Sequence, residues 1–93
     1  MERINAIAAA HDLRVIEDCA QATGLGDLHN RRAGTWGEVG CFSFFPTKNL
    51  GCAGDGGAIV TDNPRIYEQA RLLRDHGCKA RNNPITLGLN SRL

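Results

Sequence analysis

Hydrophobic and polar positions along the chain predict a helix, three short strands and a second helix, in that order. Between Glu2 and His11, apolar residues recur at helical spacing, which predicts a helix. No Ser, Thr, Asp or Asn precedes this helix to cap it, so we expect the chain to begin inside an element. Residues 14–17 then predict a strand that ends at Asp18. A helix, a short loop and a strand ending in an acid are typical of half an α/β unit.

The centre of the chain contains its most apolar run, residues 41–45, which ends at Pro46. This run predicts a buried strand with a single hydroxyl, Ser43. Residues 58–61 predict another strand, and the two strands could pair as a hairpin around the lysine segment between them. Residues 21–40 and 51–57 are rich in glycine and predict loops.

The second helix has the clearest boundaries. Asp62 or Asn63 can cap it, Pro64 suits its first turn, and two arginines lie near its carboxyl end. Gly77 is placed for the C′ position just past the helix end. Residues 78–92 show little periodicity, so no further element is predicted and the chain is expected to end without a closing one.

The composition limits the classes of protein that the chain can belong to. It has 93 residues, enough for one small domain and too few for two ordinary ones. A formal net charge of +1 gives no electrostatic reason to expect nucleic acid or an anionic membrane as partner. No apolar run has the length of a membrane helix, and no signal peptide opens the chain.

The four cysteines show no metal-ligand spacing, so we expect no metal site. An even count is compatible with two disulfides. Nothing in the sequence indicates export, however, and this favours reduced, structural thiols. The three histidines have no nucleophile or ligand partner nearby in sequence and are assigned structural roles.

Two residues could take part in chemistry on local grounds. Lys48 lies between a Phe-rich strand and a Gly-rich turn, where desolvation would free its amine to form a Schiff base. The alternative is a loop lysine that points into water. Asp18 ends a strand, the place where ligands bind in α/β sheets, and could pair with a protonated ring nitrogen. It could equally be a helix cap or a surface acid.

Other local candidates leave similar alternatives. Ser43 is a phosphate ligand or a buried hydroxyl bonded to nearby backbone. Gln21 could donate to a phenolic oxygen or simply lie in a loop. The glycines of residues 51–57 fail the P-loop pattern, and Gly24 and Gly26 fail the dinucleotide pattern because His29 occupies its third glycine position.

Several strings of residues together resemble one known family, the DegT/DnrJ/EryC1/StrS family. Its members are sugar aminotransferases of the fold-type I, aspartate aminotransferase-like, pyridoxal-phosphate (PLP) superfamily. The strings that carry the resemblance, which covers nearly the whole chain, are residues 15–22 (VIEDCAQA), 33–37 (AGTWG), 41–51 (CFSFFPTKNLG), 54–58 (GDGGA), 72–77 (LLRDHG) and 88–93 (GLNSRL).

The resemblance implies an α/β fold, namely part of the PLP-dependent transferase large domain, with a mixed, mostly parallel sheet and flanking helices. Residues 1–93 are then expected to be a partial large, cofactor-binding domain. Family members are several times longer, so an N-terminal segment and a C-terminal small domain are expected to be absent.

The resemblance also implies roles for five residues. Lys48 would form the Schiff base with pyridoxal 5′-phosphate and later act as general base and acid. Asp18 would keep the pyridine nitrogen protonated, and Gln21 would contact the ring or its 3-oxygen. Ser43 would bind the phosphate. Asn90 would reach the phosphate of a neighbouring subunit's cofactor, which implies a homodimer.

The function implied is transfer of an amino group, commonly from glutamate, to a keto sugar that is usually nucleotide-linked. The expected location is the cytoplasm. A dehydratase branch of the family has histidine in place of the lysine, so Lys48 favours the aminotransferase branch. The alternative is a catalytically inactive truncated remnant, or an interaction module of the same family.

Overall fold

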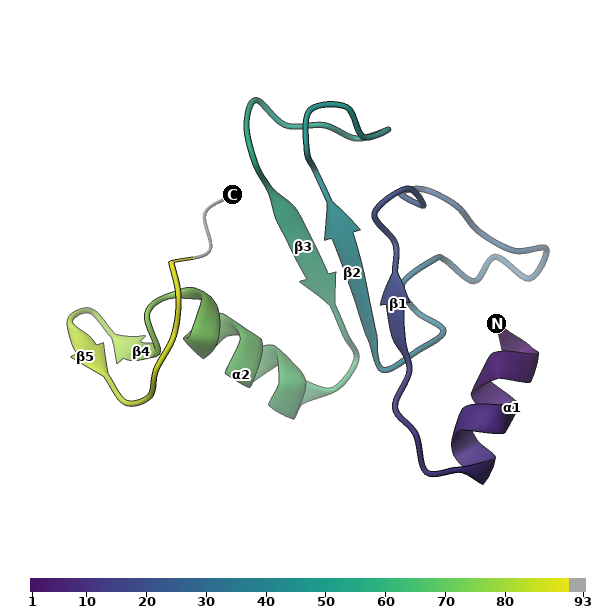
Figure 1. Ribbon diagram of the computed structural model, residues 1–93, viewed down its shortest axis with the longest axis horizontal. Coiled ribbons are helices and arrows are strands. Elements are labelled where there is room, and N and C mark those ends of the chain that lie inside the picture. The colour runs from purple at the N-terminus through teal and green to yellow at the C-terminus, as the bar shows by residue number, and fades with distance from the viewer. Residues whose placement is uncertain (91–93) are drawn as a thin grey trace.

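The computed structural model describes residues 1–90. Its helices and strands lie side by side and are joined by loops (Figure 1). Two helices and five strands lie in these residues. In chain order they are α1 Glu2–Ala10, β1 Ile16–Asp18, β2 Val39–Ser43, β3 Gly57–Val60, α2 Pro64–Arg74, β4 Cys78–Ala80 and β5 Asn83–Pro84.

The main sheet has the order β1-β2-β3 and contains both kinds of strand pairing. β1 runs parallel to β2, with Asp18 opposite Cys41. β2 runs antiparallel to β3, with Ser43 opposite Gly57. The fold is therefore mixed α/β with a mixed sheet, as expected. The predicted hairpin around the lysine segment is confirmed, because β2 and β3 are joined by residues 44–56.

The strand boundaries differ from those predicted. β1 begins at Ile16 rather than at residue 14, because its partner β2 begins at Val39. β2 also ends earlier than residue 45. Beyond Ser43 the chain leaves the sheet, and Lys48 N–H donates to Phe45 C=O at 2.8 Å in a turn. β3 is Gly57–Val60 rather than residues 58–61.

The second helix agrees with its prediction at the amino end. Asn63 is the N-cap, and its side chain accepts a hydrogen bond from Arg65 N–H at 3.0 Å. At the carboxyl end the prediction for Gly77 was off by one residue. His76 follows the C-cap and takes the left-handed conformation with φ +56°, while Gly77 N–H donates to Leu72 C=O at 2.9 Å.

A short hairpin of β4 and β5 follows α2, and the sequence did not predict it. Asp75 and Asn90 add an isolated antiparallel bridge beside it. These pairings are made by backbone groups of polar, turn-rich segments. They therefore leave no hydrophobic periodicity in the sequence.

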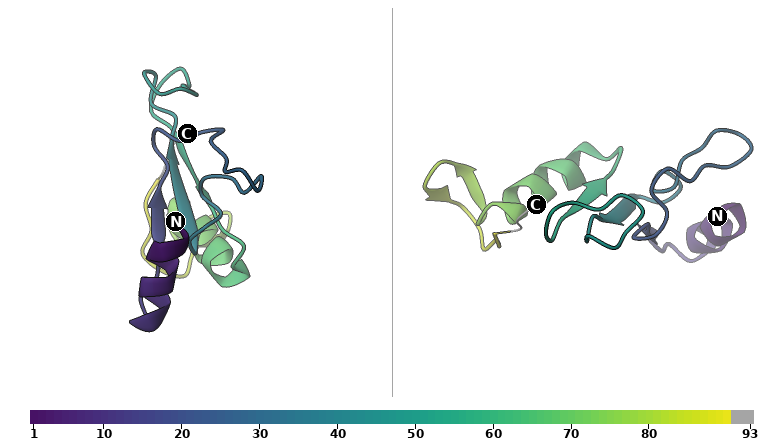
Figure 2. Two further views of the ribbon diagram at one scale, coloured as in Figure 1. Left: turned by 90° about the vertical axis from the view of Figure 1, so that its right-hand side faces the viewer. Right: turned by 90° about the horizontal axis from the view of Figure 1, so that it is seen from above.

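The apolar interior is small. Ala8 and Cys19 are the buried apolar side chains of residues 1–90, and Ile16 on β1 and Ile59 on β3 are 68% and 57% exposed. The expected buried strand at residues 41–45 is only partly buried, since Phe45 is 46% exposed. The molecule is thin, with extents of 45 × 34 × 18 Å (Figure 2). The face of the sheet that carries Ile16 and Ile59 is thus largely open.

Three further observations concern the cysteines, the helix lengths and metal ligands. All four cysteines are free thiols. Among residues 1–90, neither helix has the length and apolar character needed to cross a membrane. The same residues contain no cluster of histidine, cysteine and acidic side chains arranged to hold a metal ion.

Candidate functional site

The carboxyl ends of β1 and β2 lie at one edge of the sheet because these strands are parallel. Asp18 is the last residue of β1, and Ser43 is the last residue of β2. This edge is the usual place for a ligand in a sheet with parallel strands. Asp18 is exposed there, and one of its carboxylate oxygens accepts a hydrogen bond from Ala20 N–H at 3.0 Å, which turns the chain away from the strand.

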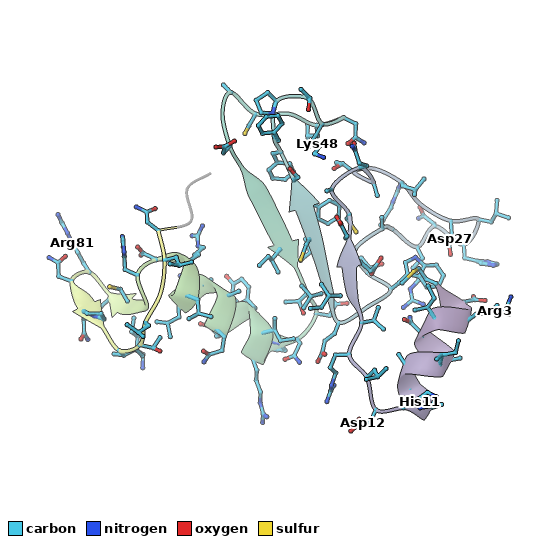
Figure 3. The ribbon with its side chains drawn as sticks, in the orientation of Figure 1. Arg3, His11, Asp12, Asp27, Lys48 and Arg81 are labelled. Carbon is cyan, nitrogen blue, oxygen red and sulfur yellow. The ribbon has the colours of Figure 1, made fainter. Side chains whose placement is uncertain are left out.

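Lys48 lies in the loop that joins β2 to β3, above the same edge of the sheet (Figure 3). Backbone hydrogen bonds close the base of this loop, from Phe44 N–H to Gly56 C=O at 2.7 Å and from Cys52 N–H to Phe44 C=O at 2.8 Å. Lys48 is partly buried, although it is on a loop. The loop is therefore held to the sheet at its base.

A side-chain hydrogen bond joins the lysine loop to the segment that follows β1. Asn49 Nδ2 donates to Thr23 C=O at 3.1 Å, across 26 positions of the sequence. Thr23 Oγ1 is buried and has no hydrogen-bond partner among residues 1–90. The structure thus brings the loop that carries Lys48 next to the segment that follows Asp18.

The other predicted site residues divide into two groups. Ser43 is partly buried at this edge, and its Oγ accepts a hydrogen bond from Phe45 N–H at 3.3 Å, so its own O–H is available to donate. Gln21 is exposed in the segment just after Asp18. Asn90, in contrast, lies in the chain beyond β5 and pairs with Asp75 at the end of α2. The structure does not bring Asn90 to the edge that carries Lys48.

Glu17 is a buried carboxylate that the sequence did not single out. It accepts backbone N–H groups from Gly34 at 3.0 Å, Trp36 at 2.6 Å and Gly37 at 2.7 Å. Burial by itself raises the pKa of Glu17, but these three N–H groups and the charge of Arg31 outweigh it, so its pKa is lowered. The sequence signal that could have identified Glu17 is an acid within an apolar strand that is followed by a glycine-rich loop.

The loop that Glu17 holds requires glycine at two positions. Gly34 has φ +87°, and a Cβ there would lie 2.8 Å from the Phe42 ring. A Cβ at Gly37 would lie 2.5 Å from Val15 C=O. The loop therefore packs directly onto the backbone of the sheet, and Glu17 completes its hydrogen bonding.

A hollow of about 560 Å³ lies beside β1, between α1 and the loop that follows the strand. Asp18 and Trp36 line it, and the Arg31 guanidinium stacks over the Trp36 ring at 4.3 Å from the ring centroid. Lys48 and Ser43 do not line this hollow. Of the predicted site residues at this edge, Asp18 alone lines this hollow.

Comparison with known proteins identifies the class. The fold is shared with a solved aminotransferase from Brucella abortus, which superposes with a TM-score of 0.88 at 42% identity, covering 99% of this chain and 25% of that one. The whole chain, residues 1–93, matches the model of the DegT/DnrJ/EryC1/StrS aminotransferase family. The chain belongs to this family.

Two curated relatives are nucleotide-sugar aminotransferases by name. The chain is 50% identical over 93 residues to the UDP-N-acetyl-3-dehydro-alpha-D-glucosamine 3-aminotransferase of Acidithiobacillus ferrooxidans, covering 100% of this chain and 25% of that protein. It is 45% identical over 93 residues to the dTDP-3-amino-3,4,6-trideoxy-alpha-D-glucose transaminase of Streptomyces venezuelae, covering 100% and 24%. The chain thus spans about a quarter of the length of these relatives.

Solved structures share the fold. The DesV protein of S. venezuelae, in complex with a ketimine intermediate, superposes with a TM-score of 0.91 at 45% identity, covering 100% of this chain and 25% of that one. NtdA of Bacillus subtilis with bound cofactor PMP gives 0.83 at 34% identity, covering 99% and 21%. The E. coli GDP-4-keto-6-deoxy-D-mannose-3-dehydratase with bound hydrated PLP gives 0.73 at 35% identity, covering 92% and 21%.

Proposed function

We propose that this chain is part of the large, cofactor-binding domain of a PLP-dependent nucleotide-sugar aminotransferase. The chain belongs to an aminotransferase family, and one structural observation supports the proposal. The Lys48 hairpin and the Asp18 segment meet at the carboxyl edge of β1 and β2, joined by the hydrogen bond from Asn49 to Thr23.

The side chains at this edge fit PLP by their chemistry. An aldehyde suits the amine of Lys48, a pyridinium nitrogen suits the carboxylate of Asp18, and a phosphate suits the hydroxyl of Ser43. When bound, PLP supplies an electron-accepting ring that stabilises negative charge on the substrate carbon beside the nitrogen.

Each residue then has a defined role. Lys48 attaches the cofactor through Nζ and afterwards carries a proton at that atom. Asp18 keeps the ring nitrogen protonated by charge, because a neighbouring anion favours the charged form of a base. Ser43 donates to the phosphate, and Gln21 binds the ring face or its 3-oxygen. Asn90, on a different part of the chain, serves the cofactor of a second copy in a homodimer.

The reaction we propose is amino transfer from glutamate to a keto sugar carried on a nucleotide, in the cytoplasm. The names of the two relatives support the nucleotide-sugar class. The similarity to a dehydratase supports the dehydratase branch of the family as the alternative. Lys48 favours amino transfer, because by resemblance that branch has histidine at this position.

The attachment of PLP tests the proposal directly. The chain contains only two lysines, Lys48 and Lys79, so each serves as the control for the other. We expect PLP followed by borohydride to mark Lys48, with peptide mass mapping as the measurement. Lys48→Ala should lose the mark, whereas Lys79→Ala should keep it. A mark that is equal on both lysines would contradict the proposal.

A second candidate, a non-catalytic interaction module of the same family, rests on the exposed apolar side chains. α2, β3 and residues 87–89 line a groove of about 710 Å³ that is lined mainly by apolar side chains, among them Ile59, Ile66 and Leu73. An assay of amine transfer from glutamate to nucleotide-linked keto sugars separates the two. PLP attachment without amine transfer would favour the interaction module.

A further inference from the structure

We infer that Asn49 is a positioning residue that holds the lysine loop over the end of β1. Its Nδ2 atom donates to Thr23 C=O at 3.1 Å, while the residue before it is Lys48. This inference rests on the proposed role of Lys48 and adds a residue that nothing else assigns. Asn49 acts through the loop and does not itself touch a ligand.

The loop needs such a tie because its other hydrogen bonds lie within the hairpin. The bonds of Phe44, Lys48 and Cys52 join residues 44–56 to one another. They fix the shape of the loop. Among the hydrogen bonds of residues 1–90, the one from Asn49 to Thr23 joins this loop to the chain after β1 and so helps to set its position relative to β1.

The acceptor is placed to transmit this constraint to Asp18. Thr23 follows the turn that begins at Asp18, where Ala20 N–H donates to the Asp18 carboxylate and Ala22 N–H donates to Cys19 C=O. Cys19 is 2% exposed, and its own N–H donates to Cys41 C=O on β2 at 2.8 Å. The acceptor segment is therefore anchored to the sheet, and the amide of Asn49 sets the position of Lys48 relative to Asp18.

The test compares PLP attachment at Lys48 with attachment at Lys79 in the same molecule. Because losing one hydrogen bond changes an equilibrium by about three- to tenfold, Asn49→Ala should lower the Lys48-to-Lys79 ratio by about that factor. Asn49→Gln, which keeps the amide donor, should restore much of the ratio. Arg3→Ala, at an exposed position of α1 away from both lysines, should leave the ratio unchanged. A merely structural loss would not be rescued by glutamine.

The outcomes separate this inference from the proposed function. An unchanged ratio in Asn49→Ala, with the wild type still marked at Lys48, would overturn the role of Asn49 alone. A wild type marked equally on both lysines would overturn the role of Lys48. In that case NMR tests the hydrogen bond from Asn49 to Thr23 directly. Cross-peaks between the Asn49 side-chain amide protons and Thr23 would support the bond, and their absence would overturn it.

Discussion

Glu17 Oε1 accepts the backbone N–H of Trp36 at 2.6 Å, which fastens a loop to the strand that also bears Asp18. Adjacent residues of a strand project to opposite faces. Glu17 therefore holds the loop on one face of the sheet, while Asp18 lies on the opposite face at the end of the strand. Glu17 is buried and Asp18 is exposed, as this arrangement requires.

Replacing Glu17 by glutamine should destabilise the fold. The carboxylate accepts N–H groups at both of its oxygens, and the amide would turn a donor towards one of them. We expect a loss of about 1–3 kcal/mol in the free energy of unfolding, measured by urea denaturation. Glu2→Gln, at an exposed position in the first turn of α1, is the matched control. Equal stability of the two variants would contradict the role of Glu17.

The lowered pKa of Glu17 predicts how stability depends on pH. A carboxyl with a lower pKa in the folded state binds fewer protons there than in the unfolded chain. Its stabilising contribution is complete above the unfolded pKa, about 4.3, and is lost as the pH falls through the lower folded value. Unfolding curves between neutral and acidic pH should show this loss in the wild type and a smaller loss in Glu17→Gln. Parallel curves would contradict it.

Asp18→Asn should weaken PLP binding without removing the attachment at Lys48. The amide is nearly the same size but carries no charge to hold the ring nitrogen protonated. We expect the affinity for PLP to fall on the order of tenfold, as measured by absorbance titration. Asp62→Asn, at an exposed position before α2, should bind like the wild type. Unchanged affinity in Asp18→Asn would remove Asp18 from the site.

Cys19 should react with thiol reagents more slowly than the other cysteines. It is 2% exposed, and burial together with the charges of Glu17 and Asp18 and the nearby Cys41 raises the pKa of its thiol. The thiolate is the reactive form, so both access and ionisation slow the reaction. Maleimide labelling followed by peptide mapping should show Cys19 marked after Cys52, which is only partly buried. Labelling of Cys19 first would contradict the packing around β1.

Asn63→Ala should destabilise α2 through the loss of its cap. The side chain of Asn63 satisfies Arg65 N–H, one of the amides that the helix leaves unpaired. We expect a loss of about 0.5–2 kcal/mol in the free energy of unfolding. Asp62→Ala removes the neighbouring candidate and should cost less. A larger effect at Asp62 would show that the cap has been misassigned.

The elements could be predicted where their signals are local. The spacing of apolar residues indicates α1 and α2, and the Asn63-Pro64 pair marks the start of α2. The apolar run before Pro46 indicates β2, but its ends depend on pairing with β1 and β3, so both boundaries shifted. The hairpin of β4 and β5 was missed because backbone pairing of polar residues has no hydrophobic pattern.

The sequence proposes residue types for the candidate site but not the contacts that connect them. A lysine after an apolar strand and an acid at a strand end are visible as patterns, and the family resemblance assigned them. The bond from Asn49 to Thr23 crosses 26 positions, and the three bonds of Glu17 cross 17 to 20. Contacts at such separations depend on how the sheet brings segments together.

The sequence alone indicates the family and the two helices and proposes the residues that would bind PLP, because local propensity and side-chain chemistry are properties of short segments. The tertiary structure alone decided which edge of the sheet Asp18, Ser43 and Lys48 share, since strand direction sets where strand ends lie. It also decided that Glu17 is an internal anchor while Asp18 is exposed. Two adjacent acids differ in this way because the pleat of a strand sends them to opposite faces.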